Sequence, residues 1–387
     1  MARWQKVYLE RQTAEVATST YGTVQTDLPE QDYITSLMLT PYQLNNTTSA
    51  NAGLVPCFLA VKNIEVVDGA NVIQSLSGAE AQAGAFYRGG TDPCGMRCDW
   101  ESTETFDNFY MRFGRFDGDP ELMLDCNQLT NPQVKMTYDF VTTVYDGLTY
   151  TMPTTPTFKW TCLADVLRGA PAGAPRGFIR SRRIYDYTQA ASSTQYIDIP
   201  RTEPIYGIMM RGGYTAVDLE QDFHEVKLNI NNDEWVPIHL YDDELYSQFD
   251  EWWPDAPTVS YRVEMIGGNR LDSGLGFIVG AQQDLKLGVC DMSHIVSDVG
   301  GYPKIEICSH DGNWDTSNSY PVFWTIRGKF PHHTFYLPMS EIVDGGAYAL
   351  DATQTSKIQL ELTSGAAANA AATVEVVLDT IADYTRW

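Results

Sequence analysis

The sequence has few basic residues, no long hydrophobic run and no even set of cysteines. Lysine and arginine number 26 against 50 aspartate and glutamate residues, which gives a formal net charge of −24. A surface this acidic repels phosphate groups, so general nucleic-acid binding is excluded and solubility is favoured. No stretch approaches the roughly 18 apolar residues of a transmembrane helix. The first residues lack the apolar core of a signal peptide, so we expect synthesis in the cytoplasm.

The seven cysteines are an odd number scattered through the chain, which argues against a secreted disulfide framework. Cys94 and Cys98 lie close together, but no second ligand pair follows at zinc spacing. We interpret them as loop thiols.

Motifs for catalysis are also missing. The sequence has no Gly-rich phosphate loop, no serine or cysteine nucleophile motif and no His-Glu-x-x-His. His332 and His333 are adjacent, and on a strand such neighbours face opposite ways, so structural roles are favoured over a metal. The acidic runs at 231–234, 242–244 and 250–251 lack EF-hand spacing. We predict no enzyme activity, cofactor or metal, with a calcium site as the alternative.

What the sequence does contain is one pattern that occurs twice. Residues 27–39 lie over 198–210 without a gap. Three further blocks match in the same order: Ile64, Val66, Val72, Leu76 and Glu80 over Leu228, Ile230, Val236, Leu240 and Glu244; 109–111 and 124–125 over 335–337 and 350–351; and 134–138 over 358–362. A repeat of this size indicates two fused copies of one domain.

Each copy has the composition of a β-sheet protein. The chain holds 22 tyrosines, 30 glycines and 19 prolines, a turn density typical of all-β folds. Apolar or alternating runs predict strands at 34–39, 58–67, 109–113, 134–142 and 157–163. Asp68-Gly69 predicts a hairpin turn, since glycine supplies a positive φ angle.

These signals divide the chain into four segments. We interpret residues 1–23 as an N-terminal arm. It has a short amphipathic start, in which Trp4, Val7 and Tyr8 have helical spacing, and then a Thr/Ser/Ala-rich sequence. The arm either packs on its own domain or reaches a neighbour or a lipid surface. The remaining segments are a first sandwich at 24–165, a linker at 166–194 and a second sandwich at 195–387.

The linker contains the Gly/Ala/Pro-rich run 169–177, which cannot form a core. The second sandwich is longer, because 28 residues lie between positions 80 and 109 but 90 lie between 244 and 335. The extra residues predict an inserted lobe at about 245–333 with strands of its own, at 259–266 and 322–327.

The sequence resembles a known family most clearly in the strand-turn-strand segment 64–78 and in the closing strand runs 357–362 and 373–381. The chain resembles the double jelly-roll major capsid proteins of the lineage from adenovirus to tailless, membrane-containing phages. The resemblance implies an all-β fold of two tandem eight-stranded jelly-roll β-sandwiches. It also implies a homotrimer that forms a pseudo-hexagonal capsomer of an icosahedral virion capsid, over an internal membrane. The implied partners are neighbouring capsomers, penton or minor capsid proteins and that membrane, without direct nucleic acid.

Two other functions stay open. Tyr246, Phe249, Trp252 and Trp253 could stack on sugars, which would suit a carbohydrate-binding or carbohydrate-active β-sandwich protein. We favour the interpretation that they anchor the inserted lobe to its sandwich or fill a subunit interface. A minor virion spike or penton protein is the second alternative.

The few basic residues are concentrated in two places. Arg3, Lys6 and Arg11, together with Trp4, are predicted to contact the membrane at the inner face of the shell. The second place is the linker, which is also predicted to lie on the membrane-facing side. Its arginines are Arg176, Arg180, Arg182 and Arg183. The competing explanation is that these cations pair with acidic residues across subunit contacts.

Overall fold

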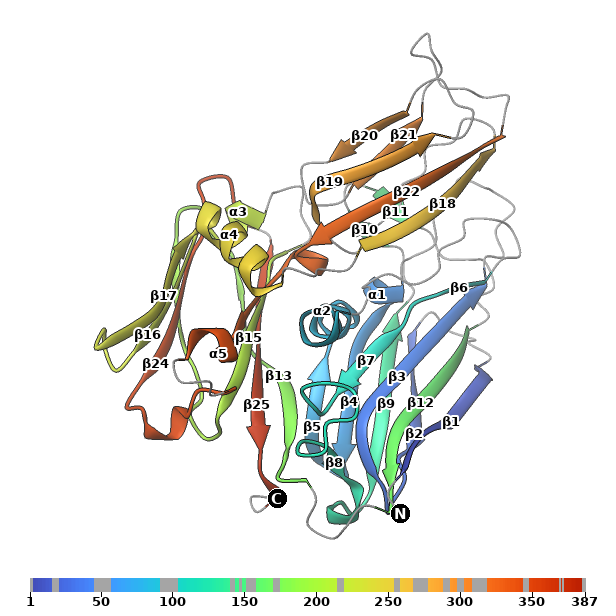
Figure 1. Cartoon of the computed structure of the whole chain (residues 1–387), viewed down its shortest axis with the longest axis vertical. Helices are drawn as coiled ribbons and strands as arrows, with labels where there is room; N and C mark the ends of the chain where they lie inside the picture. The colour runs from blue at the N-terminus through green and yellow to red at the C-terminus, as the bar shows by residue number, and fades with distance from the viewer. Residues whose placement is uncertain are drawn as a thin grey trace.

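Two β-sandwiches and a third group of strands make up the protein (Figure 1). The structure is a computed structural model. It describes residues 3–15, 21–44, 57–90, 104–139, 143–145, 148–150, 158–169, 175–213, 219–253, 258–266, 278–287, 293–297, 303–307, 319–343, 348–368, 370 and 372–384. Within these residues, no helix is long and apolar enough to cross a membrane.

The first sandwich has two facing sheets. One contains β1 (Arg3–Glu15), β12 (Phe158–Arg168) and β3 (Tyr33–Leu44), with β6 (Glu104–Phe106), β7 (Phe109–Arg112) and β8 (Leu124–Asp125) along β3. The other contains β2 (Tyr21–Asp27), β9 (Pro132–Asp139), β4 (Val61–Asp68) and β5 (Asn71–Leu76). Its helices and remaining strands are α1 (Cys57–Ala60), α2 (Gly78–Gly89), η1 (Cys126–Gln128), β10 (Thr143–Tyr145) and β11 (Leu148–Tyr150).

The second sandwich repeats this arrangement. One sheet contains β13 (Phe178–Thr188), β25 (Thr373–Ala382), β15 (Ile205–Arg211) and β23 (Thr334–Pro338). The other contains β14 (Thr194–Asp198), β24 (Ile358–Thr363), β16 (Glu225–Ile230) and β17 (Trp235–Tyr241). Its helices are α3 (Leu219–Asp222), α4 (Asp242–Trp252), η2 (Pro331–His333), α5 (Met339–Ile342) and η3 (Ala352–Gln354).

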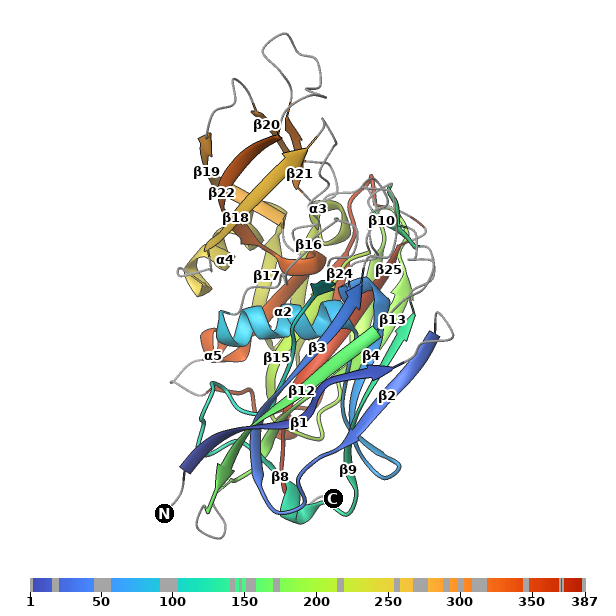
Figure 2. The same cartoon turned by 90° about the vertical axis from the view of Figure 1, so that its right-hand side faces the viewer.

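A third group of strands lies between α4 and η2 in the sequence. β18 (Thr258–Ile266), β22 (Ser319–Lys329) and β19 (Ile278–Leu287) form one sheet, and β20 (Ser293–Ser297) pairs with β21 (Pro303–Ile307). These strands project from one end of the molecule, and both termini lie at the opposite end (Figures 1 and 2).

Alternation of apolar and polar residues produces the sandwich strands. In β9, Val134, Met136 and Tyr138 are buried and the residues between them are half-buried. β24 has the same pattern in Ile358 and Leu360. Because successive side chains of a strand face opposite ways, every second residue enters the core. Full burial of each such side chain contributes about 1.5–3 kcal/mol.

The repeat in the sequence falls on equivalent structural elements. Glu80 in α2 and Glu244 in α4 each occupy the third helical position. Each carboxylate accepts a hydrogen bond from the backbone N–H that precedes the helix, at 2.6 Å from Ser77 and 3.0 Å from Tyr241. This capping interaction explains why glutamate recurs there.

The repeated block at 124–125 and 350–351 also falls on equivalent structural elements. Asp125 and Asp351 each precede a 3-10 turn and accept a hydrogen bond from the N–H two residues on. A short acceptor side chain stabilises the start of such a turn.

Three expectations from the sequence are wrong in detail. Residues 3–15 of the expected arm are not helical; they form β1, which pairs with β12 along the first sandwich. Most of the expected linker is strand, since β12 runs to Arg168 and β13 begins at Phe178. The strand expected from position 58 begins at Val61, after the short helix α1. The Asp68-Gly69 turn is confirmed, with φ of 58° at Gly69.

Candidate assembly surfaces

The two sandwiches are joined by a continuous sheet. β5, the last strand of the first sandwich in that sheet, lies parallel to β13, and Ser75 is opposite Arg182. Beside this contact, the Gln74 side-chain amide donates to the carbonyls of Arg112 at 3.0 Å and Ile179 at 2.9 Å. The open edge of one sheet is therefore covered by the edge of the next, which leaves neither free to pair with another chain.

A network of ion pairs lies across this junction. Arg183 on β13 binds both carboxylate oxygens of Glu80 at 3.0 Å, and Glu80 is fully buried. Arg183 also contacts Glu375 at 3.0 Å, and Arg211 contacts the same carboxylate at 2.7 Å. Paired hydrogen bonds between a guanidinium and a carboxylate fix orientation as well as distance. The network therefore sets how α2 of the first sandwich sits on the second.

The charges of the network shift its pKa values. Burial alone would raise the pKa of Glu80, but the hydrogen bond and charge of Arg183, with the charge of Arg211, hold it below its usual range. A carboxylate with a lowered pKa adds stability above its unfolded pKa of about 4.5. That contribution is lost as the pH falls through the lower, folded value.

Aromatic side chains close the same junction above the network. Tyr87 of α2 stacks on Tyr336 at 5.3 Å between ring centroids, and its hydroxyl donates to the Thr334 carbonyl at 2.6 Å. Trp253 donates its ring N–H to the Tyr87 carbonyl at 3.0 Å.

The other aromatic residues of α4 pack against the core. Phe249 is fully buried and packs on Phe86 and Phe330, and Tyr246 and Trp252 pack against the same core. The expectation that these aromatics anchor the insertion is confirmed.

The segment that follows the inserted strands has an unusual backbone conformation. Phe330, His332 and His333 have positive φ angles of 53°, 54° and 58°. Both histidines are buried, but they belong to η2 and not to a strand. The expectation that they face opposite sides of a strand is therefore wrong. His332 hydrogen-bonds the Gln82 side chain at 2.7 Å. Buried packing holds these strained conformations in place.

A buried acid lies next to this segment. Asp222 of α3 is fully buried, and its carboxylate is 3.8 Å from the imidazole Nδ1 of His333. Burial raises the pKa of Asp222, and the contacts with His333 and Gln189 offset only part of that rise.

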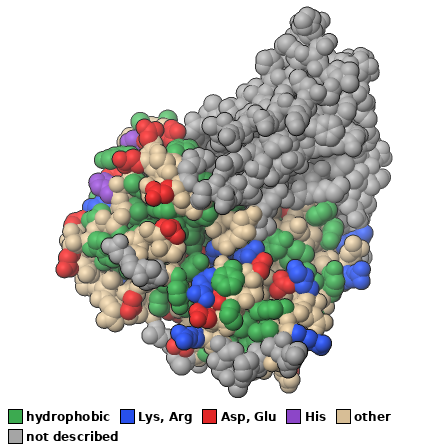
Figure 3. Space-filling view, viewed as in Figure 1, with side chains coloured by type: hydrophobic (Ala, Val, Ile, Leu, Met, Phe, Trp, Pro, Cys, Tyr) green, Lys and Arg blue, Asp and Glu red, His purple; other side chains and the backbone are tan. Residues whose placement is uncertain are grey.

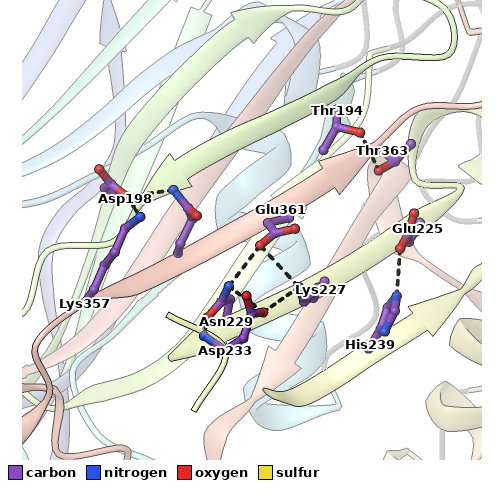
Figure 4. Close-up of polar contacts among 11 residues, drawn as sticks. Thr194, Asp198, Glu225, Lys227, Asn229, Asp233, His239, Lys357, Glu361 and Thr363 are labelled. Atoms are coloured by element: carbon purple, nitrogen blue, oxygen red, sulfur yellow. Dashed lines mark hydrogen bonds and ion pairs between the residues drawn. The ribbon is translucent and has the colours of Figure 1, made fainter. Parts of the chain in front are cut away.

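The outer face of the sheet that contains β16 and β24 is polar (Figure 4). Lys227 reaches Asp233 at 2.8 Å and Glu361 at 3.6 Å, and His239 contacts Glu225 at 2.7 Å. These side chains are paired with one another and carry little apolar surface. Exposed pairs of this kind contribute only about 0–1 kcal/mol each, so this face suits contact with solvent.

The four predicted contact residues all lie on β1, but not at one place. Arg3, Trp4, Lys6 and Arg11 are exposed. Lys6 is 3.6 Å from Asp165 of its own chain, and the guanidinium of Arg11 lies 5.2 Å from the Tyr8 ring. A strand rises about 3.3 Å per residue, so Arg3 and Arg11 are roughly 25 Å apart. Figure 2 shows β1 rising from the end where the termini lie.

The linker arginines have partners within the chain. Arg180 contacts Glu203 at 2.5 Å, and Arg183 is held in the ion-pair network. Arg182 is half-buried on the same strand, while Arg176 is exposed. The charges of Arg180 and Arg183 are thus paired within the chain; that the linker faces a membrane stays a prediction.

Sites for metals or small ligands are poorly supported in the described residues. They contain no group of three or more histidine, cysteine or acidic residues that could hold a metal ion. Of the acidic runs, Asp233 binds Lys227 and Asp242 contacts His224 at 2.9 Å. The best-formed pocket in this part of the chain, between α3, α4 and Phe330, has space for about one water molecule. Cys94 and Cys98 lie outside the described residues.

No family model and no curated protein sequence matches the chain. Solved structures do. The STIV MCP, from Sulfolobus Turreted Icosahedral Virus, aligns with a TM-score of 0.57 and 10% identity over 99% of this chain and 98% of its own. The major capsid protein P2 of bacteriophage PM2 aligns with a TM-score of 0.50 and 10% identity over 98% of both chains. PBCV-1 VP54 aligns at 0.53 and 11% identity over 98% of this chain and 94% of its own.

The chain has the double jelly-roll fold. The predicted fold class and the resemblance in fold are confirmed. Within the described residues, β1 and β17 are edge strands, and the junction between the sandwiches covers the edges of β5 and β13. Sequence reasoning missed the junction, because Glu80 and Arg183 are 103 positions apart. The signal that could have found it is the glutamate recurring at 80 and 244.

Replacing Glu80 by glutamine tests the junction. The change removes the buried carboxylate that binds Arg183 through two hydrogen bonds and should lower the free energy of unfolding by about 2–4 kcal/mol. Glu244→Gln is the matched control, since Glu244 holds the same helix position but is exposed, and it should cost less than about 1 kcal/mol. Denaturation of dilute protein, followed by fluorescence, measures both. Equal losses would show that the ion pair does not hold the sandwiches together.

Proposed function

We propose that this protein is the major capsid protein of an icosahedral virus and that three copies form a pseudo-hexagonal capsomer. The observation that carries the proposal is the end-to-end likeness to capsid proteins, which spans 98–99% of this chain and 94–98% of theirs in the three comparisons above. The role is structural and not enzymatic. Two similar sandwiches per chain supply six in a trimer, which approximates a hexagon.

The physical character of the chain suits this role. A jelly roll covers most of its sheet edges by pairing two sheets, which protects a protein made in many copies from random edge pairing. The continuous sheet and the buried ion pairs make the two sandwiches one rigid unit. In capsomers the partners are further copies of the chain, neighbouring capsomers, and penton or minor capsid proteins at the vertices.

A carbohydrate-binding or carbohydrate-active protein is less well supported. Tyr246, Phe249, Trp252 and Trp253 pack against the core instead of forming a platform for sugars. The pocket between α3, α4 and Phe330, next to these aromatics, has space for about one water molecule and is too small for a sugar.

The oligomeric state tests the proposal. Purified protein at micromolar concentration and neutral pH should have the mass of a trimer, three times 43.3 kDa, by light scattering coupled to size exclusion. The reason is that the apolar and aromatic edge surfaces become buried only when chains meet. A monomer that persists at high concentration would contradict the proposal.

The orientation in the shell follows from the positions of the two ends. The inserted strands and the termini lie at opposite ends (Figure 1), so we place the inserted strands outward and the termini inward, toward an internal membrane. Arg3 and Trp4 are the predicted contact residues that lie nearest the N-terminus. A cation near anionic lipid contributes roughly 1 kcal/mol, and tryptophan favours the membrane interface.

A vesicle experiment tests this placement. The double substitution Arg3→Glu with Trp4→Ala should reduce flotation of trimers with vesicles rich in phosphatidylserine by about 10-fold, because attraction becomes repulsion. Removing residues 2–11 is unsuitable, since it would take out most of β1 and open the sandwich. Lys62→Glu, which changes an exposed cation beside α1, is the control and should bind as wild type. Equal binding by all three proteins would place the contact elsewhere.

A further inference from the structure

Of the edge strands in the described residues, β1 and β17 lie on opposite flanks of the molecule. Among the described strands, β1 pairs only with β12 and β17 pairs only with β16. Figure 1 shows β17 at one side of the protein and β1 at the other. Such edges present unpaired N–H and C=O groups that can pair with another chain.

The junction inside the chain shows what such an edge accepts. There β5 is the edge strand that runs into α2, and it lies parallel to β13, with Ser75 opposite Arg182. The first turn of α2 then places Glu80 against Arg183. The contact therefore consists of an edge strand, the helix that follows it and one partner strand.

The second sandwich has the first half of this contact without a partner. β17 and α4 are the repeat counterparts of β5 and α2, at a constant offset of 164. On this offset His239 corresponds to Ser75, and Tyr241 corresponds to Ser77. Glu244 corresponds to Glu80 and occupies the same helix position.

The first sandwich has the other half. Residues 27–39 lie over 198–210, which makes Met38 equivalent to Met209. Following the strand pairing from Met38 across β12 leads to Tyr8 on β1. Following it from Met209 across β25 leads to Arg183 on β13. β1 is therefore the counterpart of β13, and Tyr8 holds the position of Arg183.

An irregularity in both strands supports this equivalence independently. The pairing of β1 with β12 shifts between Tyr8 and Glu10. The pairing of β13 with β25 shifts between Arg183 and Tyr185, directly after the equivalent residue. Bulges recur at fixed places within a fold because they set the bend of a strand.

We propose that the edge of β17 and the start of α4 dock onto β1 of a second copy of this chain, so that the internal junction is repeated between subunits. The inference rests on the proposed capsomer and specifies its subunit contact. Val7, the counterpart of Arg182, then lies opposite His239 of the neighbouring copy.

The chemistry of the two surfaces is complementary. Tyr8 is 57% exposed and Tyr241 is 47% exposed, and they occupy the positions of Arg183 and Ser77. Arg11 stacks over Tyr8, while α4 begins with Asp242, Asp243 and Glu244. Figure 3 shows acidic side chains gathered at the upper left, near α3 and α4, and basic side chains along the right-hand flank. An aromatic contact flanked by opposite charges thus replaces the Glu80–Arg183 ion pair of the internal junction.

The contact uses two different surfaces of the chain, so it is head to tail. Head-to-tail contacts form closed rings when the rotation between subunits divides a full turn. Because each junction joins one sandwich to the next, similar junctions within and between chains place six sandwiches in a ring of three chains.

Tyr8→Glu tests the contact with β1. The substitution sets an acidic side chain against the acidic start of α4 and should raise the trimer dissociation constant by about 10-fold or more. Tyr196→Glu is the matched control: Tyr196 is 59% exposed on β14, at the other edge of the sheet that contains β17. It should assemble as wild type. Far-UV circular dichroism and the melting temperature confirm that both variants fold.

A charge exchange tests the pairing itself. Arg11→Glu and Glu244→Arg should each weaken the trimer by several-fold, and the two together should restore at least half of the lost association. Light scattering over a dilution series measures all four proteins. Arg11 and Glu244 are exposed, and Glu244→Arg removes one helix-capping hydrogen bond, so circular dichroism and the melting temperature check that both single variants fold.

The outcomes separate this inference from the proposed function. A wild-type protein that stays monomeric overturns the proposed capsomer. A stable wild-type trimer that Tyr8→Glu and the charge variants do not weaken overturns the β17–β1 contact alone. Equal weakening by Tyr196→Glu also overturns it, because any exposed edge would then serve.

Discussion

Every open edge of a β-sheet must be covered or kept apart from other edges, and this constraint organises the protein. Within the chain, β13 covers the edge of β5, and the ion pair of buried Glu80 with partly exposed Arg183 fixes the angle at which they meet. The aromatic cluster around Tyr87 and the strained return at His332 and His333 are built on the same contact. The fusion of two domains therefore produces one block whose described edge strands include β1 on one flank and β17 on the other.

The open flanks give the acidic composition a physical meaning. With a net charge of −24, copies of this chain repel one another unless cations are placed where they meet. Several of the few arginines are used inside the chain, as at Arg180 and Arg183, where they neutralise buried acids. Those on β1 remain exposed, and α4 offers an acidic helix start on the opposite flank. Assembly is then directed by charge as well as by apolar area.

Much of the fold could be predicted because the repeated blocks carry packing information. Glutamate at 80 and 244 recurs since a helix start needs a capping acceptor, and alternating runs recur since each strand has one buried face. The strand β1 escaped prediction for two reasons. Apolar residues occupy both faces of the strand, with Trp4 and Tyr8 exposed and Val7 packed against the core, so the three imitate helical spacing. Its residues also differ from those of β13, because the two strands meet different partners.

The central claim is that one junction, present once in the chain, organises three chains into a ring of six sandwiches. Negative-stain or cryo-electron microscopy of the purified protein tests it most directly. The account predicts particles of hexagonal outline with true threefold symmetry and all six termini on one face. Inserted strands should project from the other face. Single elongated particles, or rings of any other symmetry, would contradict it.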